Sequence, residues 1–520
     1  MLLSAVLWGP WLAALILALL PVPDARTAMA PASSLKPSET RSRLKGVAIA
    51  LASGLLGLQV WLWQAVDIGA GGFQLAEFQT WLPGLGLNYS LAVDGLALPL
   101  LGLNALLTWI VVLSSDRTQV RPKLFYVLVF LIHGGIAGAL LSQNLLLFLL
   151  FYELELIPVY LAIAVFGGPN RDLAAMKFLV YTAISGLILL GALVALGWVA
   201  GGAMPEFEFG AIQSAQIPLN LQLALAIALL IGFGIKTPLV PLHAWLPDTY
   251  VEASAPIAIL LGGILAKLGS YGLFRFILQL LPEAWQVLSP YLAIWGAVCV
   301  LYGAIAAIAQ KDIKRMVAYS SIGHMGYILL AGAAATPLAV TGGIVQMASH
   351  GLILAVLFDL VGIIEKKVGT RDLDVLNGLF NPVRGLPAIA AFLVVGGMAS
   401  AGLPGLVGFV AEYLIFQGSI SVFPIPTLVC IFGTGLTAVY FVILMNRTCF
   451  GKLDNFTSYY PQVTPNERVP AFLLTLLVVF FGLAPGNLTR WSEATAVQLV
   501  RPAPTATVSA LVPMHIEVKR

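Results

Sequence analysis

The chain alternates between long apolar runs and short polar connections. Fourteen apolar segments can be drawn, at 2–22, 46–67, 95–114, 124–142, 144–166, 173–201, 221–243, 254–281, 286–309, 316–334, 337–363, 386–422, 426–446 and 469–486. Most reach the roughly 20 residues that a helix needs to cross a bilayer. The first lacks the basic start of a cleaved signal peptide, so we expect a retained span. The pattern predicts an all-α polytopic membrane protein with about 14 transmembrane helices.

Proline and glycine interrupt two of these segments. Pro238 and Pro241 remove amide donors just after Lys236, so carbonyls around 233–235 need other partners. A second break is expected at 402–405, in the sequence GLPG. Each break falls in the fourth span of a five-span block, and an odd number of spans per block predicts inverted repeats. The expected divisions are the N-terminal spans (1–123), two repeats (124–281 and 286–446), and the last span with its tail (447–520).

The connections between the apolar segments differ in charge. Lys and Arg occur only in the odd-numbered connections, counted from the first, and the even-numbered ones contain neither. Basic connections stay on the cytoplasmic side of a membrane. We therefore expect the odd connections to be cytoplasmic and both termini to lie on the opposite side.

Composition excludes several other classes of protein. Of the 520 residues, 59% are hydrophobic and 10% are charged, whereas soluble domains carry about 25% charged residues. The three cysteines are widely separated, which gives neither an iron–sulfur nor a zinc framework and predicts no metal or cofactor on this chain. A net charge of +3 gives no indication of nucleic-acid binding.

Ionisable side chains lie inside the apolar segments, where each charge costs about 2.5–3.5 kcal/mol on insertion scales. The candidates for a proton path are Glu153, Lys177, Lys236, Lys267, His324, His350 and Glu412. Such residues persist in a membrane where they are paired, hydrated or functional. We expect His133 to be a hydrogen-bonded packing residue, and Asp359 and Arg275 to reach the membrane interface from span ends.

The candidates can be ordered into a relay. Glu153 and Glu155 point about 200° apart on a helix, so only one can face the interior. Glu153 is the expected interior carboxylate and partner of Lys236, while Glu155 serves a neighbouring subunit or a local hydrogen bond. Opening and closing the Glu153–Lys236 pair would change the lysine's proton affinity. Lys267 would pass the proton to the two histidines, and Glu412 would be the exit group.

These residues, in this order, resemble the antiporter-like membrane chains of type-1 NADH dehydrogenase (complex I), in particular chain 4. The similar strings are YELELIP at 152–158, AMKF at 175–178, PLHAWLPD at 241–248, LAK at 265–267, AYSSIGHMG at 318–326, QMASHG at 346–351, and GLPG through Glu412 at 402–412. The double-acid string looks more like the cyanobacterial and plastid chain than the respiratory bacterial one.

The resemblance implies a proton-translocating subunit of an NAD(P)H- or ferredoxin-driven plastoquinone reductase in the thylakoid membrane. It implies antiporter-like chains 2 and 5 and lipid as partners, and places NAD(P)H or ferredoxin, iron–sulfur clusters and plastoquinone on partner subunits. The family's key carboxylate falls on Glu153, its lysines on Lys177, Lys236 and Lys267, its histidines on His324 and His350, and its exit acid on Glu412. Departures from the family pattern at Asn144, Tyr152, Gly323 and 364–370 favour the carbon-concentrating variant of the complex.

Two other functions remain open at this point. The chain could be a cation/proton antiporter or a subunit of one, although few oxygen ligands for a cation flank Lys236. It could also be a membrane scaffold whose buried charges only satisfy one another. A quinone site on this chain is less favoured, because nothing in the sequence supplies redox ligands.

Overall fold

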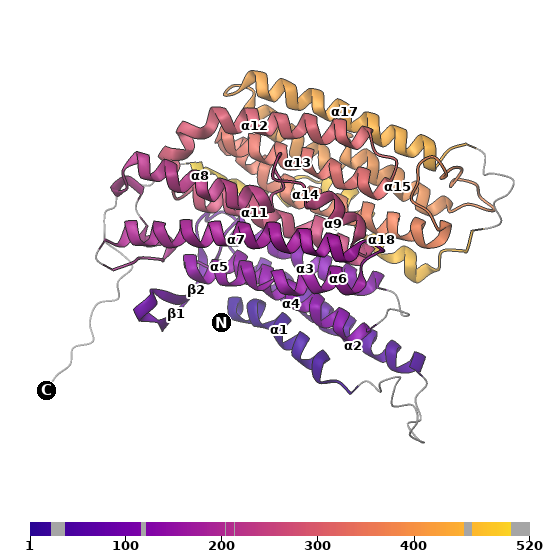
Figure 1. Cartoon of the computed structure of the whole chain (residues 1–520), viewed down its shortest axis with the longest axis horizontal. Coiled ribbons are helices and arrows are strands. Elements are labelled where there is room, and N and C mark those ends of the chain that lie inside the picture. Colours follow the sequence, from indigo (N-terminus) through magenta and orange to yellow (C-terminus); the bar gives the residue numbers. More distant parts are fainter. Residues whose placement is uncertain (22–36, 116–120, 203, 213, 452–459, 501–520) are drawn as a thin grey trace.

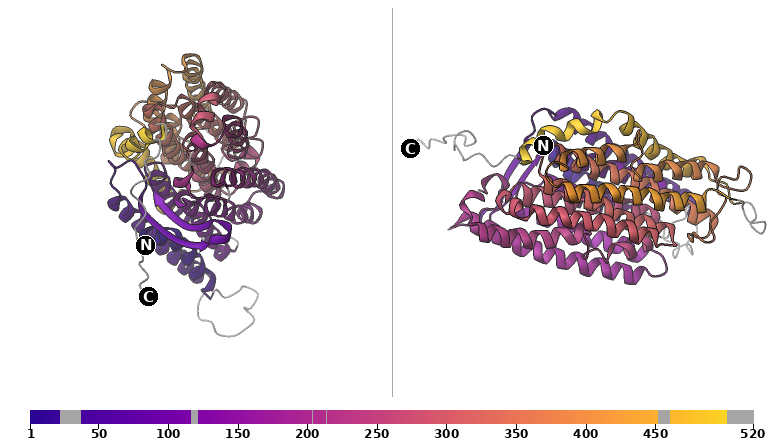
Figure 2. Two further views of the ribbon diagram at one scale, coloured as in Figure 1. Left: turned by 90° about the vertical axis from the view of Figure 1, so that its left-hand side faces the viewer. Right: turned by 90° about the horizontal axis from the view of Figure 1, so that it is seen from above.

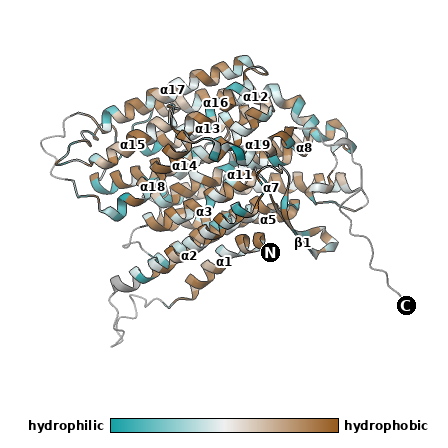
Figure 3. Ribbon diagram, turned by 180° about the vertical axis from the view of Figure 1, so that it is seen from behind, coloured by the Kyte–Doolittle hydropathy of each residue, from teal (hydrophilic) through white to brown (hydrophobic). Residues whose placement is uncertain are grey.

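The computed structural model describes residues 1–21, 37–115, 121–202, 204–212, 214–451 and 460–500. Long helices run roughly side by side along one axis of the molecule (Figures 1 and 2). Hydrophobic residues cover most of their length (Figure 3). The molecule is an all-α, multi-pass membrane protein, as the apolar pattern predicts.

The first half of the chain contains one hairpin among its helices. Its elements are α1 (Leu2–Leu19), α2 (Pro37–Ala65), β1 (Gln74–Leu82), β2 (Leu87–Val93), α3 (Ala97–Ser114), α4 (Pro122–Leu141), α5 (Leu145–Leu154), α6 (Leu156–Phe166), α7 (Arg171–Gly201), α8 (Leu219–Lys236), α9 (Leu246–Glu252), α10 (Ala255–Leu260), the π-helical turn η4 (Leu261–Leu265), α11 (Ala266–Gly272) and the π-helical turn η5 (Leu273–Leu278).

The second half of the described chain is helical. Its elements are α12 (Pro282–Ile308), α13 (Ile313–Ala334), α14 (Pro337–Val368), α15 (Pro387–Ser400), α16 (Val407–Ser419), α17 (Pro424–Thr448), α18 (Pro465–Leu483) and α19 (Gly486–Val500). Short 3-10 turns occur at Pro83–Leu85, Phe209–Ala211 and Ser214–Gln216.

Twelve helical stretches in the described residues are long and apolar enough to cross a membrane. The expected segment at 316–334 corresponds to α13, which is not among the twelve. The expected segment at 386–422 is divided between α15 and α16, neither of which is long enough alone. The count of fourteen spans therefore stays a prediction.

Both expected interruptions are present, and their backbone groups find partners. At the end of α8, Pro238 has no N–H, and the Leu239 N–H instead reaches the Gly234 carbonyl at 2.9 Å. The Ile235 carbonyl then accepts a hydrogen bond from the Trp245 indole at 2.8 Å. This is the side-chain partner that the sequence requires for a carbonyl freed at this break.

The second interruption separates α15 from α16. Gly402 and Gly405 both have positive φ, 73° and 91°, a backbone conformation that favours glycine. The inverted relation of the two five-span blocks stays a prediction, although each block contains its broken helix.

A hairpin and a tail helix cover one end of the bundle, and the apolar pattern predicts neither. β1 and β2 pair antiparallel, with Glu77 opposite Leu91 and Thr80 opposite Asn88. The hairpin lies near the start of α1 (Figure 1), where the Leu3 N–H donates to Glu77. Thr495 of α19 donates to the Gly71 carbonyl at 2.8 Å. Residues at 67–94 thus form ordered structure rather than a plain polar connection.

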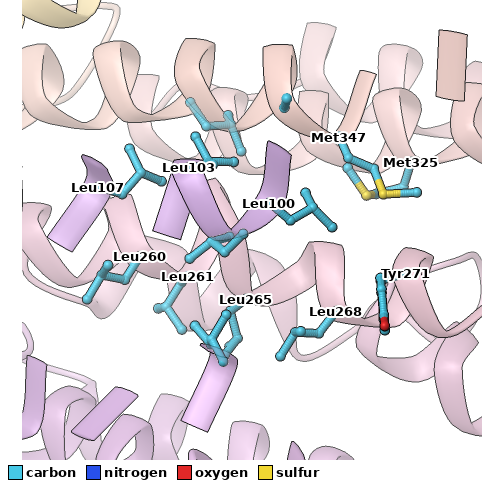
Figure 4. Packing of buried hydrophobic residues seen from close by; sticks show 14 of the residues in the cluster. Leu100, Leu103, Leu107, Leu260, Leu261, Leu265, Leu268, Tyr271, Met325 and Met347 are labelled. Atoms are coloured by element: carbon cyan, nitrogen blue, oxygen red, sulfur yellow. The ribbon is translucent and has the colours of Figure 1, made fainter. Parts of the chain in front are cut away.

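The interior is centred on the run from α10 to η5, in which residues 257–278 are all buried. Leucines of α3 lie beside leucines of this run (Figure 4). Close backbone approach accompanies this packing, since a Cβ at Gly351 of α14 would collide with the Gly263 carbonyl. Membrane helices associate through such small-residue contacts, because burial from lipid supplies little hydrophobic driving force. The run therefore packs closely around Lys267.

Candidate functional site

The buried ion pair between Lys236 and Glu155 is the first part of the site. Lys236 is the last residue of α8, directly before the proline interruption, and its ammonium donates to the Glu155 carboxylate. Both side chains are almost fully buried, at 1% and 0% exposure. The Tyr152 ring lies 4.6 Å from the Lys236 ammonium, an additional cation–π contact. An interrupted helix thus presents a charged lysine to an internal counter-charge.

The prediction that Glu153 is the interior carboxylate and partner of Lys236 is wrong. Glu153 is only partly buried and faces α7, where a Cβ at Gly186 would collide with its carboxylate. Glu155 instead stands at a break between α5 and α6, because Pro158 has no N–H to offer the carbonyl of Leu154. The two glutamates do face different ways, as expected, but their spacing alone does not say which faces inward. Glu153 still interacts electrostatically with Lys236.

Lys177 lies apart from this pair, near the end of the molecule that carries the basic connections. Its ammonium is 2.5 Å from the Asp248 carboxylate, and its side chain is 40% exposed. Asp248, at the start of α9, also binds Arg315 at 2.8 Å. The structure therefore assigns Lys177 to a half-exposed charge cluster, whose acidic member the sequence analysis did not single out.

Lys267 lies in the buried run from α10 to η5. Its side chain is fully buried, and its ammonium donates to the carbonyl of Gly262 on the π-helical turn η4. Among the described residues, no direct hydrogen bond or ion pair joins Lys267 to Lys236, to His324 or to His350. Lys267 interacts electrostatically with both histidines. A π-helical turn beside a buried lysine is typical of functional sites.

His324 and His350 lie together between α13 and α14. Their ring centroids are 4.7 Å apart, and both side chains are buried. His324 contacts Gln346 and Ser400 through its two ring nitrogens, each at 3.0 Å. Within the described part of the chain, neither ring nitrogen of His350 has a hydrogen-bond partner.

Glu412 of α16 lies next to the second helix interruption and is the last of the candidate residues along the chain. Its Oε1 lies 3.8 Å from His324 Nδ1. Its Oε2 accepts a hydrogen bond from Thr434 of α17 at 3.1 Å, and Thr434 in turn contacts Tyr327 at 2.9 Å. A Cβ at Gly402 would lie 2.7 Å from Glu412 Oε2, so glycine at this position lets the carboxylate approach the break.

Three further ionisable side chains were assigned roles from the sequence. His133 is a buried packing residue, as expected, with Nδ1 2.8 Å from the Thr108 hydroxyl. Arg275 and Asp359 are buried within the protein, at 2% and 5% exposure, and their reaching the membrane interface stays a prediction. Arg275 is paired with Asp94, and that acid, which follows the hairpin, gives the arginine a buried partner that span boundaries do not reveal.

The site therefore consists of separate polar groups rather than one continuous chain of direct contacts. These groups are the Lys236–Glu155 pair, Lys267, and the His324–Glu412 cluster. Sequence analysis identified most of these charged residues, but it gave Glu155 another role and did not single out Asp248 or the neutral partners. Pro158, three residues after Glu155, was the available signal for the first of these.

Comparison with known proteins agrees with this arrangement. Residues 142–437 match the family described as NADH:quinone oxidoreductase/Mrp antiporter, transmembrane. A Synechococcus sp. (strain JA-3-3Ab) protein named NAD(P)H-quinone oxidoreductase chain 4 1 is 40% identical over 94% of this chain and 92% of that relative. A Nostoc sp. (strain PCC 7120) protein of the same name is 36% identical over 96% and 90%, respectively.

Solved structures show the same fold. A chain of respiratory complex I from Thermus thermophilus superposes with a TM-score of 0.82 at 28% identity, covering 96% of this chain and all of that one. A chain of the Mrp complex from Dietzia sp. gives 0.81 at 20% identity, over 97% and 98%. The matched family and these relatives show that the chain belongs to the NADH:quinone oxidoreductase/Mrp antiporter transmembrane family, among the NAD(P)H-quinone oxidoreductase chains 4.

Proposed function

We propose that this chain is a proton-translocating membrane-arm subunit of an NAD(P)H- or ferredoxin-driven plastoquinone oxidoreductase. The observation that carries the proposal is the buried Lys236–Glu155 pair at the end of an interrupted helix. Isolated charges are costly at membrane depth, and those that persist there mark ion and proton pathways. Family membership supports the same function.

The pair can control proton affinity by opening and closing. When it is closed, the Glu155 carboxylate stabilises the charged ammonium of Lys236. When it opens, the ammonium stands in a low-dielectric interior without a counter-charge and tends to release its proton. A small movement of α8 at its interruption would be sufficient, because the regular helical bonds end with the Thr237 N–H to the Phe233 carbonyl and Pro238 has no N–H to continue them.

The proton would then pass through Lys267 to His324 and His350 and leave through Glu412. Hydration is needed between these groups, because they do not contact one another continuously. Lys177 and Asp248 would serve proton uptake at the end with the basic connections, and Glu153 would be an additional carboxylate beside the main pair. These roles are proposals for Glu153, Lys177, Lys236, Lys267, His324, His350 and Glu412.

The chain would act as one subunit of a larger enzyme. Electron transfer from NAD(P)H or ferredoxin through iron–sulfur clusters to plastoquinone would take place on partner subunits. Antiporter-like chains 2 and 5 would adjoin this chain in a thylakoid membrane, with the odd connections on the cytoplasmic side and both termini on the lumenal side. In the carbon-concentrating form of the complex, proton removal would favour CO2 hydration.

Substitution of Glu155 by glutamine tests the proposal. Glu155→Gln keeps the size of the side chain but removes the counter-charge, so vesicles with the assembled complex should lose proton uptake driven by the electron donor. Lys311→Ala, which removes a lysine that is 75% exposed, is the matched control and should leave uptake unchanged. Normal uptake with Glu155→Gln would contradict the assigned pair. Sodium-dependent transport by the isolated chain would favour a cation/proton antiporter instead.

A further inference from the structure

We infer that Gln346 is a positioning residue that controls proton transfer from His324 to Glu412. Gln346 lies on α14, one helical turn before His350, so the two side chains share a face. It is buried at 1% exposure. The inference rests on the proposed function. It adds a side chain that controls the last proposed transfer inside the protein, from His324 to Glu412, and we call this control the gate.

The geometry around His324 assigns the position of its proton. Nε2 of the Gln346 amide lies 3.0 Å from Nδ1 of His324. With the amide in this orientation its nitrogen donates, so Nδ1 is the accepting nitrogen of a neutral imidazole. The ring proton is then on Nε2, directed at the Ser400 hydroxyl 3.0 Å away. Gln346 and Ser400 together hold one tautomer of His324.

Near the unprotonated Nδ1 of His324, two side-chain oxygens lack a hydrogen-bond donor among the described residues. Oε1 of Glu412 lies 3.8 Å from Nδ1 and, like Oε1 of Gln346, has no hydrogen-bond partner among the described residues. Buried polar atoms without a partner are rare and costly. A proton on Nδ1 would supply the donor that each of these two oxygens lacks, first to one and then to the other.

The transfer step follows from these atoms. When Nδ1 of His324 gains a proton, it becomes a donor and cannot face the NH2 group of Gln346. The terminal amide torsion is broad and roughly two-fold, so a half-turn brings Oε1 to Nδ1–H at little cost. The Glu412 carboxylate, 3.8 Å away, then moves to hydrogen-bond distance of Nδ1 in place of the amide oxygen. The Nδ1–H bond breaks and an O–H bond forms on Glu412 Oε1, which leaves a neutral carboxylic acid and a neutral imidazole. The amide turns back and again blocks Nδ1.

The ionisable groups that face His324 fit this sequence of events. His350 lies 4.7 Å away between ring centroids and is the adjacent proton source. Lys267 interacts electrostatically with both histidines, and Tyr327 lies 5.6 Å from the His324 ring. Glu412 is the acidic group among them. Gln346 is the neutral side chain that contacts Nδ1, so it can respond to the proton without changing charge.

Two substitutions with opposite expected effects test the inference. Gln346→Leu removes both the donor and the acceptor of the amide. Proton uptake should therefore fall roughly tenfold, the effect of one lost hydrogen bond. The pH above which uptake declines should also move to a lower value. Gln346→Glu keeps an acceptor for Nδ1–H and adds negative charge. Uptake should therefore persist, and the pH above which it declines should be about one unit higher. Ser349→Ala is the matched control on the same buried helix, since the Ser349 hydroxyl donates to the Gln346 backbone carbonyl, at 3.3 Å, and to no other group among the described residues.

The outcomes separate this inference from the proposed function. If Lys236→Ala abolishes uptake but Gln346→Leu leaves both rate and pH profile unchanged, the gate is refuted and the proposed function stands. Equal losses in both Gln346 variants, without opposite pH shifts, indicate a packing role and also refute the gate. If Gln346→Leu prevents assembly, the pH profile of Gln346→Glu decides, and an unshifted profile overturns the inference. Normal uptake with Lys236→Ala overturns both proposals.

Discussion

Arg275 donates two hydrogen bonds, each 2.7 Å long, to the carboxylate of Asp94, which lies 181 residues earlier in the chain. Both side chains are buried. Asp94 also accepts the N–H groups of Leu96 and Ala97 at the start of α3. The rings of Phe73 and Phe209 lie within 5.5 Å of the guanidinium. The pair therefore fastens the turn η5 to α3 and to the hairpin end of the bundle.

Breaking this pair should strongly destabilise the protein. Arg275→Leu would leave the Asp94 carboxylate buried without a counter-charge, which costs about 3–5 kcal/mol. Thermal unfolding of the detergent-solubilised complex should show a clearly lower midpoint. The double variant Asp94→Leu/Arg275→Leu should recover part of the loss, because no uncompensated charge remains. An unchanged midpoint in the single variant would show that the pair does not hold this end together.

Gly269 of α11 should be sensitive to the addition of a single methyl group. A Cβ there would lie 2.6 Å from the Thr237 backbone nitrogen and 2.8 Å from the Phe233 carbonyl oxygen. Gly269→Ala would push α11 away from the end of α8 that holds Lys236, at a cost of about 1–3 kcal/mol. Proton uptake should fall in the assembled complex. Gly191→Ala is the control, because nothing lies within 4 Å of the added atom. Equal proton uptake in the two variants would be evidence against the close contact at Gly269.

Asp248 should matter more for transport than Lys177. Asp248 holds both Lys177, at 2.5 Å, and Arg315, at 2.8 Å. These side chains are partly exposed, so each pair contributes at most about 1 kcal/mol to stability. Asp248→Asn should therefore leave the unfolding midpoint nearly unchanged while lowering proton uptake further than Lys177→Gln does. A larger loss of uptake with Lys177→Gln would show that the lysine, rather than Asp248, matters more for proton uptake.

Asp374 should confer acid sensitivity on the connection between α14 and α15. Hydrogen bonding and charge attraction from Lys311, with a further contribution from Arg447, lower the pKa of the Asp374 carboxyl. A group with a lowered folded-state pKa stabilises above its unfolded pKa, and this contribution is lost as pH falls through the folded value. Hydrogen exchange in residues 371–386 should therefore speed up on acidification. Asp374→Asn should show the faster exchange already at neutral pH; exchange like that of the native protein would refute the contact.

The main features of the fold could be predicted from the sequence, because each depends on local chemistry. Apolar length predicts spans, and the missing N–H of Pro238 predicts the break after Lys236 together with its freed carbonyls. The hairpin was missed because the strands at 74–93 do not show as an apolar run. The helix α19 was missed because it packs on α14 and bonds Gly71 and Gly95, which flank the hairpin, contacts that its own hydrophobicity does not reveal.

The candidate site could be predicted only in part, for a similar reason. Charged residues inside apolar runs are visible in a sequence, and Lys236, Lys267, His324, His350 and Glu412 are all buried in the structure. Which of two glutamates faces inward depends on packing against other helices, so Glu153 was chosen where Glu155 makes the pair. Neutral partners such as Gln346 and Ser400 carry no such signal, because a polar uncharged side chain is common in membrane helices.

Donor-driven proton uptake by membrane vesicles carrying Lys236→Ala tests the central claim most directly, with assembly of the complex checked in the same preparation. The alanine variant removes the ammonium whose proton affinity the Glu155 carboxylate controls. We predict that uptake is abolished while the complex remains assembled. Uptake at the native rate in the assembled variant would contradict a proton path through Lys236.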